Sequence, residues 1–206
     1  MRQSLPSFRY HPDPVATGAI TESREVCACC RQSRGWIYTL SLYTEQDVPG
    51  RICPWCIADG SAAGRFDGEF VDAHGLDGVS WEVLQEVTRR TPAFSAWQDP
   101  RWLVHCHDAA AFRGEVGYTQ LAEHPEALDQ LRTDLRLGGW RDTGQLEEFL
   151  YSLGNGASAM LFQCTISVGG ISPTPTSADF GAAVPESARY SPARRHHADT
   201  MITAPR

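Results

Sequence analysis

The sequence predicts an α+β protein: a four-cysteine zinc ribbon packed on a small mixed body of short strands and two or three helices, with a disordered C-terminal tail. Three observations support this fold class. Two Cys-x-x-Cys pairs lie within residues 27–56, helical patterns recur between residues 80 and 153, and a Pro/Ser/Thr/Ala-rich stretch without periodicity follows residue 168. At 206 residues and 42% hydrophobic content, the chain is long enough for one domain with a small metal module attached.

We expect four segments along the chain. Residues 1–24 form an extended N-terminal strap, because three prolines between residues 6 and 14 exclude a helix. Phe8 and Tyr10 point the same way in such a strap and dock on the body. The remaining segments are a zinc-ribbon module, an α+β body, and a tail that is disordered or frameshifted: residues 25–64, 65–168 and 169–206.

The zinc ligands are predicted from the spacing of the cysteine pairs, and they are Cys27, Cys30, Cys53 and Cys56. Each pair bends into a tight turn, and two such turns complete a tetrahedron with Zn–S distances of about 2.3 Å. The β-forming run 35–40 lies between the pairs and predicts a ribbon of knuckle, strands and knuckle. Four thiolates leave no position for water, so the site is structural rather than catalytic. The alternative is a set of buried or redox-active cysteines.

Cys29 lies inside the first pair and offers an alternative pairing, Cys27 with Cys29. We prefer Cys27 with Cys30, because a gap of two residues lets both sulfur atoms converge on one ion without backbone strain.

The body is predicted from helix signals and one apolar run. Ser80 is a suitable N-cap for a helix through Arg90. Two further helices and a last buried strand follow, at residues 125–137, 145–153 and 157–166.

A second cluster, His105-Cys106-His107-Asp108, leaves three interpretations open. In the first, Cys106 is a nucleophile with an imidazole as base. In the second, Cys106 is a core thiol behind Trp102. In the third, either Cys106 or His107 forms a second metal site with Cys164. We favour the core thiol. Neighbouring residues on a strand point to opposite faces, so we expect His105 and Cys106 not to meet.

Composition narrows the function classes. A net charge of -7 argues against broad binding to nucleic acid or anionic membranes. No apolar run reaches the roughly 18 residues of a membrane span, and the N-terminus lacks a secretory apolar region. Paired cysteines suit a reducing compartment, so we expect a cytoplasmic protein. The acidic residues between 67 and 77 lack the pattern of a calcium loop and are expected to be solvated.

Three stretches carry a family resemblance: Leu5-Pro6-x-Phe8-x-Tyr10-His11-Pro12-Asp13-Pro14, then Cys53-Pro54-Trp55-Cys56-Ile57-Ala58-Asp59-Gly60-Ser61-Ala62, then Trp97-Gln98 with Trp102 and Cys106. The chain resembles the CbrC family of bacterial proteins over roughly residues 4 to 164. The resemblance implies a small cytosolic protein, associated with colicin tolerance and without established enzymatic activity. Members of that family close on Leu-Phe-Gln-Cys-x-x-Cys-Gly. Here Leu161-Phe162-Gln163-Cys164 is not followed by Cys-Gly.

The tail suggests a frameshift near residues 164–167. Codons for Gly170 to Ser177 can be chosen so that a shifted frame reads His-Leu-Ala-Tyr-Ala-Asp-Phe, and choices for Ser167 and Val168 permit Cys-Gly before it. Cys164 is then one half of a lost pair. Sequencing the gene tests this hypothesis.

The function predicted from these observations is non-enzymatic. The zinc stiffens a surface, and the protein acts through an unidentified protein partner in stress or colicin tolerance. One alternative is an enzyme dependent on Cys106. The other is a nucleic-acid-binding ribbon, in which three aromatic residues stack bases beside three arginines: Trp36, Tyr38 and Tyr43 with Arg31, Arg34 and Arg51. No motif identifies a small-molecule substrate.

Overall fold

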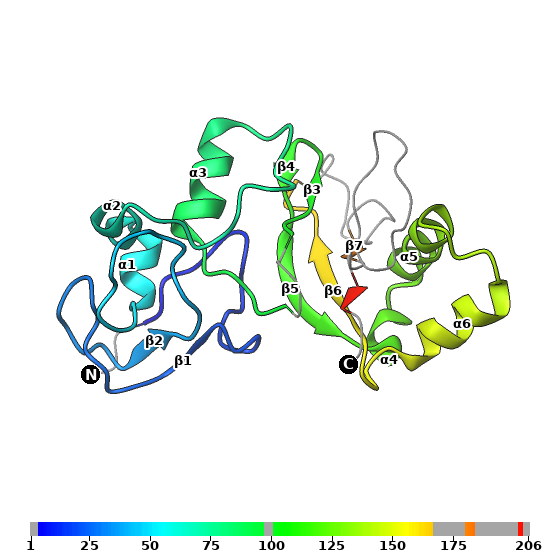
Figure 1. Cartoon of the computed structure of the whole chain (residues 1–206), viewed down its shortest axis with the longest axis horizontal. Helices are drawn as coiled ribbons and strands as arrows, with labels where there is room; N and C mark the ends of the chain where they lie inside the picture. The colour runs from blue at the N-terminus through cyan, green and yellow to red at the C-terminus, as the bar shows by residue number, and fades with distance from the viewer. Residues whose placement is uncertain (1–3, 97–100, 167–179, 184–201, 204–206) are drawn as a thin grey trace.

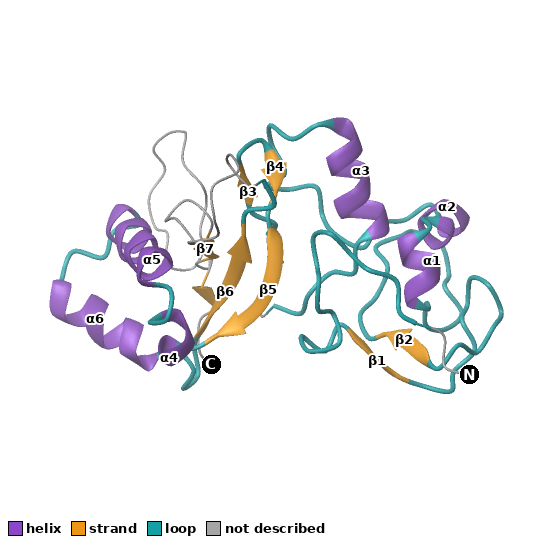
Figure 2. Ribbon diagram, turned by 180° about the vertical axis from the view of Figure 1, so that it is seen from behind, coloured by secondary structure: helices purple, strands orange, loops and turns teal. Residues whose placement is uncertain are grey.

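The computed structural model describes four stretches of the chain: residues 4–96, 101–166, 180–183 and 202–203. They are arranged around two long antiparallel strands, β5 (Ala111–Val116) and β6 (Ser158–Gln163), which run through the middle of the molecule (Figure 1). The cysteine-containing N-terminal part lies on one side of these strands. Helices α4 to α6 lie on the other side, as the view from behind also shows (Figure 2). The protein therefore combines several helices with small antiparallel sheets, as predicted.

The N-terminal part is built on a short hairpin. Strand β1 (Ile20–Glu22) pairs with β2 (Trp36–Tyr38), and Ile20 lies opposite Tyr38. We expected the strands to lie between the two cysteine pairs, but the partner of β2 precedes the first pair. The first cysteine pair instead occupies the loop between β1 and β2. Ser23 N–H donates to the Gly35 carbonyl, so the hydrogen-bond ladder of the hairpin continues towards this loop. The second pair is attached to the hairpin at Ile52, whose carbonyl accepts from Tyr38 N–H at 2.8 Å.

Three helices follow the hairpin: α1 (Pro54–Ala58), α2 (Ser61–Phe66) and α3 (Trp81–Arg90). The bounds of α3 are as predicted, because Ser80 Oγ accepts from Val83 N–H at 3.3 Å and satisfies a donor in the first turn. Arg90 Nε then donates to the Ala58 carbonyl at 2.9 Å, which ties the end of α3 to the end of α1.

The helices beyond the sheet are α4 (Tyr118–Leu121), α5 (Pro125–Leu137) and α6 (Thr143–Ser152). The prediction for α5 is confirmed at both ends. Helix α6 begins two residues before the predicted start, because Asp142 caps it and accepts from Gln145 N–H at 3.0 Å. Helix α4 is a single turn and too short for a hydrophobic period, so the described part of the body holds four helices, α3 to α6, where we expected two or three. None of these helices has the length and apolar character needed to cross a membrane.

Strands β5 and β6 separate two hydrophobic clusters. Phe112 lies opposite Phe162, and both rings face the N-terminal part. Alternate residues of β6, Ala159 and Leu161, face the helices and pack with the leucines of α5 and α6. This alternation is the period-two burial of a strand covered on both faces.

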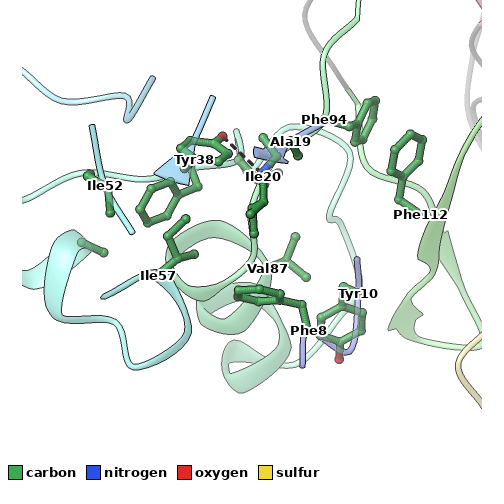
Figure 3. Close-up of a cluster of buried hydrophobic side chains, with 14 of the residues drawn as sticks. Phe8, Tyr10, Ala19, Ile20, Tyr38, Ile52, Ile57, Val87, Phe94 and Phe112 are labelled. Carbon is green, nitrogen blue, oxygen red and sulfur yellow. Dashed lines mark hydrogen bonds between the residues drawn. The ribbon is translucent and has the colours of Figure 1, made fainter. Parts of the chain in front are cut away.

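The N-terminal strap is part of the core, as predicted. Phe8 and Tyr10 are 5% and 0% exposed and lie beside Val87 of α3 (Figure 3). On the sheet side, Phe94 stacks on Phe112 with ring centroids 4.0 Å apart. Offset aromatic pairs of this kind add to the stabilisation that burial supplies. A single cluster thus joins the strap, the cysteine region and the sheet.

Two short strands come from the segment that we predicted as a disordered tail. Strand β7 (Phe180–Ala183) and strand β8 (Ile202–Thr203) both pair with β6. Strand β5 covers only one edge of β6, so the backbone groups on the other edge of β6 need hydrogen-bond partners, which β7 and β8 supply. The residues on which the frameshift hypothesis rests, 167–177, lie outside the described residues, as do Trp97 and Gln98 of the family motif.

His11 has a structural position in the core. Its ring is fully buried, Nδ1 lies 2.8 Å from the Pro92 carbonyl, and Nε2 lies 2.7 Å from Thr17 Oγ1. Because a carbonyl only accepts, Nδ1 carries the proton and Nε2 accepts from the Thr17 hydroxyl. Burial lowers the pKa of His11, so the imidazole is held neutral in the folded protein.

This histidine gives the folded protein a defined pH dependence. In the unfolded chain His11 takes up a proton near pH 6.5, whereas the lowered pKa shifts this protonation to a lower pH in the fold. The unfolded state therefore binds more protons below that pH, and the free energy of unfolding falls as the pH drops from 7 to 5. His11→Asn keeps a donor to the Pro92 carbonyl but cannot titrate, so urea denaturation across this range should show a shallower fall.

His74→Asn is the matched control, because His74 is exposed. That variant should keep the wild-type pH dependence. An unchanged slope in His11→Asn would contradict the assignment.

Candidate metal centre

The structure brings together the four cysteines of the predicted site. The Sγ atoms of Cys27, Cys30, Cys53 and Cys56 all lie within 4.8 Å of one another. The Sγ atoms are separated by 3.9 Å for Cys27–Cys56, 3.8 Å for Cys30–Cys53 and 3.6 Å for Cys53–Cys56. A tetrahedron with Zn–S bonds of about 2.3 Å has edges of about 3.8 Å. The cluster is therefore compatible with a metal ion bound by four thiolates.

The two cysteine pairs reach this point through different local structures. Cys27 and Cys30 lie in the hairpin loop, where Arg31 N–H donates to the Cys27 carbonyl at 2.9 Å and Arg31 adopts a left-handed φ of 60°. Cys53 precedes the first turn of α1 and Cys56 lies within that turn, so their sulfur atoms point the same way. Ala28 N–H donates to the Arg51 carbonyl at 2.8 Å and joins the two turns directly.

Backbone donors and burial act on these thiols in opposite directions. The amides of Cys29 and Cys53 donate to Cys27 Sγ at 3.3 and 3.2 Å. The hydrogen bond from the Cys53 thiol, together with these amides, lowers the pKa of Cys27 to about 4. Burial raises the pKa of Cys56 to about 12, and the Cys27 partner raises that of Cys53. Without a cation, these shifts favour a thiolate at Cys27 beside neutral thiols at Cys53 and Cys56.

Cys29 lies outside the cluster. Its Sγ is 3.7 Å from Ser61 Oγ, and its own amide donates to Cys27. Cys30 takes the position that the two-residue gap predicts. Metal binding by these four residues stays a prediction.

The second predicted cluster has a different geometry from the one that we expected. Strands β3 (Val104–His105) and β4 (Asp108–Ala109) form a tight hairpin whose two turn residues, Cys106 and His107, have φ values of 54° and 59°. The expectation that His105 and Cys106 point apart is wrong, because the chain reverses at Cys106 instead of continuing as a strand. Cys106 Sγ lies 3.1 Å from His105 Nδ1.

Cys164 completes this group. The donor atoms of His105, Cys106 and Cys164 lie within 4.8 Å of one another, and each of the three residues is partly buried. His107, which we considered as a ligand, is not a member, and Cys106 is not the fully buried core thiol that we favoured. Trp102, by contrast, is buried as expected and donates through Nε1 to the Ala110 carbonyl at 2.8 Å.

The sequence analysis named Asp108 of this hairpin but missed its role as a buried hydrogen-bond acceptor. Asp108 is 4% exposed and accepts from Arg9 at 2.6 Å, from Tyr10 Oη at 2.7 Å and from Thr165 Oγ1 at 2.5 Å. Burial, and then the hydrogen bond to Asp108, raise the pKa of Tyr10, so its hydroxyl stays a donor. The carboxylate therefore fastens the strap, the hairpin and the end of β6 together. These three side-chain partners are 99, 98 and 57 residues away in sequence, so no local signal reveals them.

The other candidate residues do not form sites. Within the described residues, the acidic loop between 67 and 77 contributes to no cluster of metal-binding groups. Tyr38, expected to stack on a base in the nucleic-acid alternative, is 1% exposed, and its hydroxyl accepts from Ala93 N–H at 3.3 Å. That part of the alternative is wrong.

These features define a class: a small protein of several helices and short antiparallel strands, with a four-cysteine cluster compatible with a metal ion. The chain belongs to UPF0167, an uncharacterised protein family, which matches residues 5–169. The matched region ends where the predicted tail begins.

Curated relatives support this membership. A UPF0167 protein of Mycobacterium bovis is 49% identical over 166 residues, which are 79% of this chain and 88% of the relative. A UPF0167 protein of Mycobacterium tuberculosis has the same identity and coverage. A UPF0167 protein of Pseudomonas aeruginosa is 48% identical over 126 residues, 60% of this chain and 70% of the relative. No solved structure matches the chain. The family resemblance is thus confirmed at the level of UPF0167, while the narrower CbrC name stays a prediction.

The role of Asp108 is directly measurable. Asp108→Asn removes the charge from a buried acceptor of several hydrogen bonds, so the free energy of unfolding should fall by about 2 kcal/mol. Arg9→Ala should cost less than about 1 kcal/mol, because half of the Arg9 side chain is exposed, at 52%, and water screens the pair. Urea denaturation of both variants gives the comparison. Equal losses would show that the carboxylate acts only through Arg9.

Proposed function

We propose that this protein is a zinc protein in which Cys27, Cys30, Cys53 and Cys56 hold one structural ion. The observation that supports the proposal is that three S···S separations are 3.6 to 3.9 Å, close to the edges of a four-thiolate tetrahedron, and that all four sulfur atoms lie within 4.8 Å of one another. These separations are far from the roughly 2.05 Å of a disulfide. Zn²⁺ is the preferred ion, because four thiolates in tetrahedral geometry suit zinc and it has no redox chemistry that would oxidise them.

Such an ion stabilises the N-terminal half of the molecule. The cluster joins the β1–β2 loop to the first turn of α1, and both belong to the core that contains the strap and α3. The free energy of zinc binding therefore becomes folding free energy for that half. Four protein ligands leave no position for a substrate, so this site does not favour catalysis.

We further propose that the protein acts in the cytoplasm by binding a protein partner. One support is that four protein ligands would leave no open position on the ion for chemistry. The other is the resemblance to the CbrC family, which points to a role in stress or colicin tolerance. The zinc then maintains the shape of a binding surface rather than reacting.

A second candidate function is an enzyme that uses Cys106. The observation in its favour is the 3.1 Å separation of Cys106 Sγ from His105 Nδ1, the arrangement of a thiol beside a general base. A nucleic-acid-binding ribbon has less support, because Tyr38 is buried and Arg51 donates to the carbonyl of Leu40 at 3.4 Å, within its own chain.

Zinc content is the first measurement. The protein purified without chelators or added metal should carry about one zinc per chain by elemental analysis. Cys53→Ser and Cys56→Ser each remove a ligand, so both should lose this zinc and unfold at lower urea concentration, since binding energy no longer adds to folding. Cys29→Ser is the matched control on the same loop and should keep the zinc. Full retention of zinc by both ligand variants would exclude the site.

The binding role is tested by capture of the tagged full-length chain from native lysate. Partners should be recovered with wild type and Cys29→Ser but lost with Cys53→Ser, because only the last disturbs the zinc cluster. A partner recovered equally with all three would show that the zinc-dependent surface is not what it binds.

A further inference from the structure

We propose a second metal site, formed by His105 Nδ1, Cys106 Sγ and Cys164 Sγ, that binds a borderline-soft divalent cation of the Zn²⁺ type. These three donor atoms lie within 4.8 Å of one another and come from the β3–β4 turn and from the end of β6. The site is separate in sequence from the four-cysteine cluster and shares no ligand with it. The proposal therefore stands apart from the proposed function.

The donor distances are close to those of a bound ion. Zn–N bonds of about 2.0 Å and Zn–S bonds of about 2.3 Å at a tetrahedral angle separate N and S by about 3.5 Å. The observed separation of His105 Nδ1 and Cys106 Sγ is 3.1 Å, a hydrogen-bonded pair. An ion that replaces the shared proton therefore requires a movement of about half an ångström, which a turn residue and an imidazole ring accommodate.

The turn itself is unusual for a hairpin. Two-residue hairpin turns with positive φ at both positions are usually Asn-Gly or Asp-Gly, because β-carbons are disfavoured there. Here both positions carry larger side chains, Cys106 at 54° and His107 at 59°. Strained residues of this kind persist where the surrounding structure fixes them, and they concentrate at functional sites. The conformation has a chemical consequence, since it brings the side chains of His105 and Cys106 to the same side.

The third ligand is fixed by the Asp108 network. Gln163, the last residue of β6, pairs with Ala111, which places Cys164 at the end of the sheet nearest the hairpin. The next residue, Thr165, donates to Asp108 Oδ2 at 2.5 Å and approaches the Ala109 carbonyl at 3.1 Å. Both arms of the site are thus attached to one buried carboxylate. Support of this type positions ligands before the ion arrives.

The ligand set indicates how the site would differ from the four-cysteine cluster. All three residues are only partly buried, so an ion can enter and leave. Two thiolates and an imidazole select zinc-like ions over Mg²⁺ or Ca²⁺. The described residues supply three ligands, and three protein ligands with a fourth position for water or another small ligand are typical of zinc sites that exchange or react.

A metal site explains one feature that a catalytic pair does not. A thiol activated by a neighbouring imidazole needs only Cys106 and His105. The presence of a second sulfur, Cys164, within 4.8 Å of both is unnecessary for that chemistry, but it is required for an ion.

The test uses full-length protein, reduced with a phosphine that does not bind metal, equilibrated with excess ZnCl₂ and then desalted. Wild type should retain two zinc ions per chain, and Cys106→Asn and Cys164→Ser should each retain one. Asparagine tolerates the left-handed conformation better than cysteine, so Cys106→Asn keeps the turn while it removes the thiolate. His107→Asn changes the neighbouring turn position only and should retain two.

Alkylation by iodoacetamide at neutral pH, followed by mass spectrometry, gives an independent readout. Added zinc should slow labelling of Cys106 and of Cys164 in wild type at least tenfold, and it should slow neither remaining thiol in the single variants. One zinc per chain in saturated wild type, or two in either Cys106→Asn or Cys164→Ser, would overturn the proposal. Cys53→Ser separates the two sites, because it should lose the tightly held zinc and keep zinc-dependent protection of Cys106.

Discussion

The N-terminal half of the molecule depends on how the repulsion between four clustered cysteine thiolates is relieved. Two unit charges about 4 Å apart repel by about 4 kcal/mol at an effective dielectric constant near 20. Four thiolates make six such pairs, and their sum exceeds the roughly 5–15 kcal/mol by which a domain is stable. The cluster therefore exists either as largely protonated thiols or around a cation. Only a cation bound by all four sulfur atoms would both cancel this repulsion and link the β1–β2 loop to α1.

A second constraint joins that half to the rest of the molecule. Asp108 accepts from the strap through Tyr10 and from the segment after β6 through Thr165, while it also belongs to the β3–β4 hairpin. In the same core, the rings of Phe94, Phe112 and Phe162 pack against one another. The hydrogen bonds to Asp108 hold the strap, the β3–β4 hairpin and the end of β6 together, and the aromatic cluster supplies the apolar burial. The three donors of the second site lie at this junction.

The parts that sequence reasoning found are those with local signals. The spacing of the cysteines identified the four that cluster, and the N-cap Ser80 and the leucines of residues 125–137 gave the bounds of two helices. The β3–β4 turn was missed because Cys-His is not a usual turn sequence, so the alternating pattern of a strand was the natural expectation there. The partners of Asp108, and the pairing of β7 and β8 with β6, depend on contacts between distant segments. One sequence without its relatives carries no signal for such contacts.

Zinc K-edge X-ray absorption on the Cys106→Asn protein reports the ligands of the four-cysteine cluster alone, because that variant removes the second candidate site and leaves the four-cysteine cluster intact. We expect four sulfur atoms bound to zinc at about 2.3 Å, with no bound nitrogen or oxygen. A shell that contains nitrogen or oxygen, or fewer than four sulfur atoms, would contradict it.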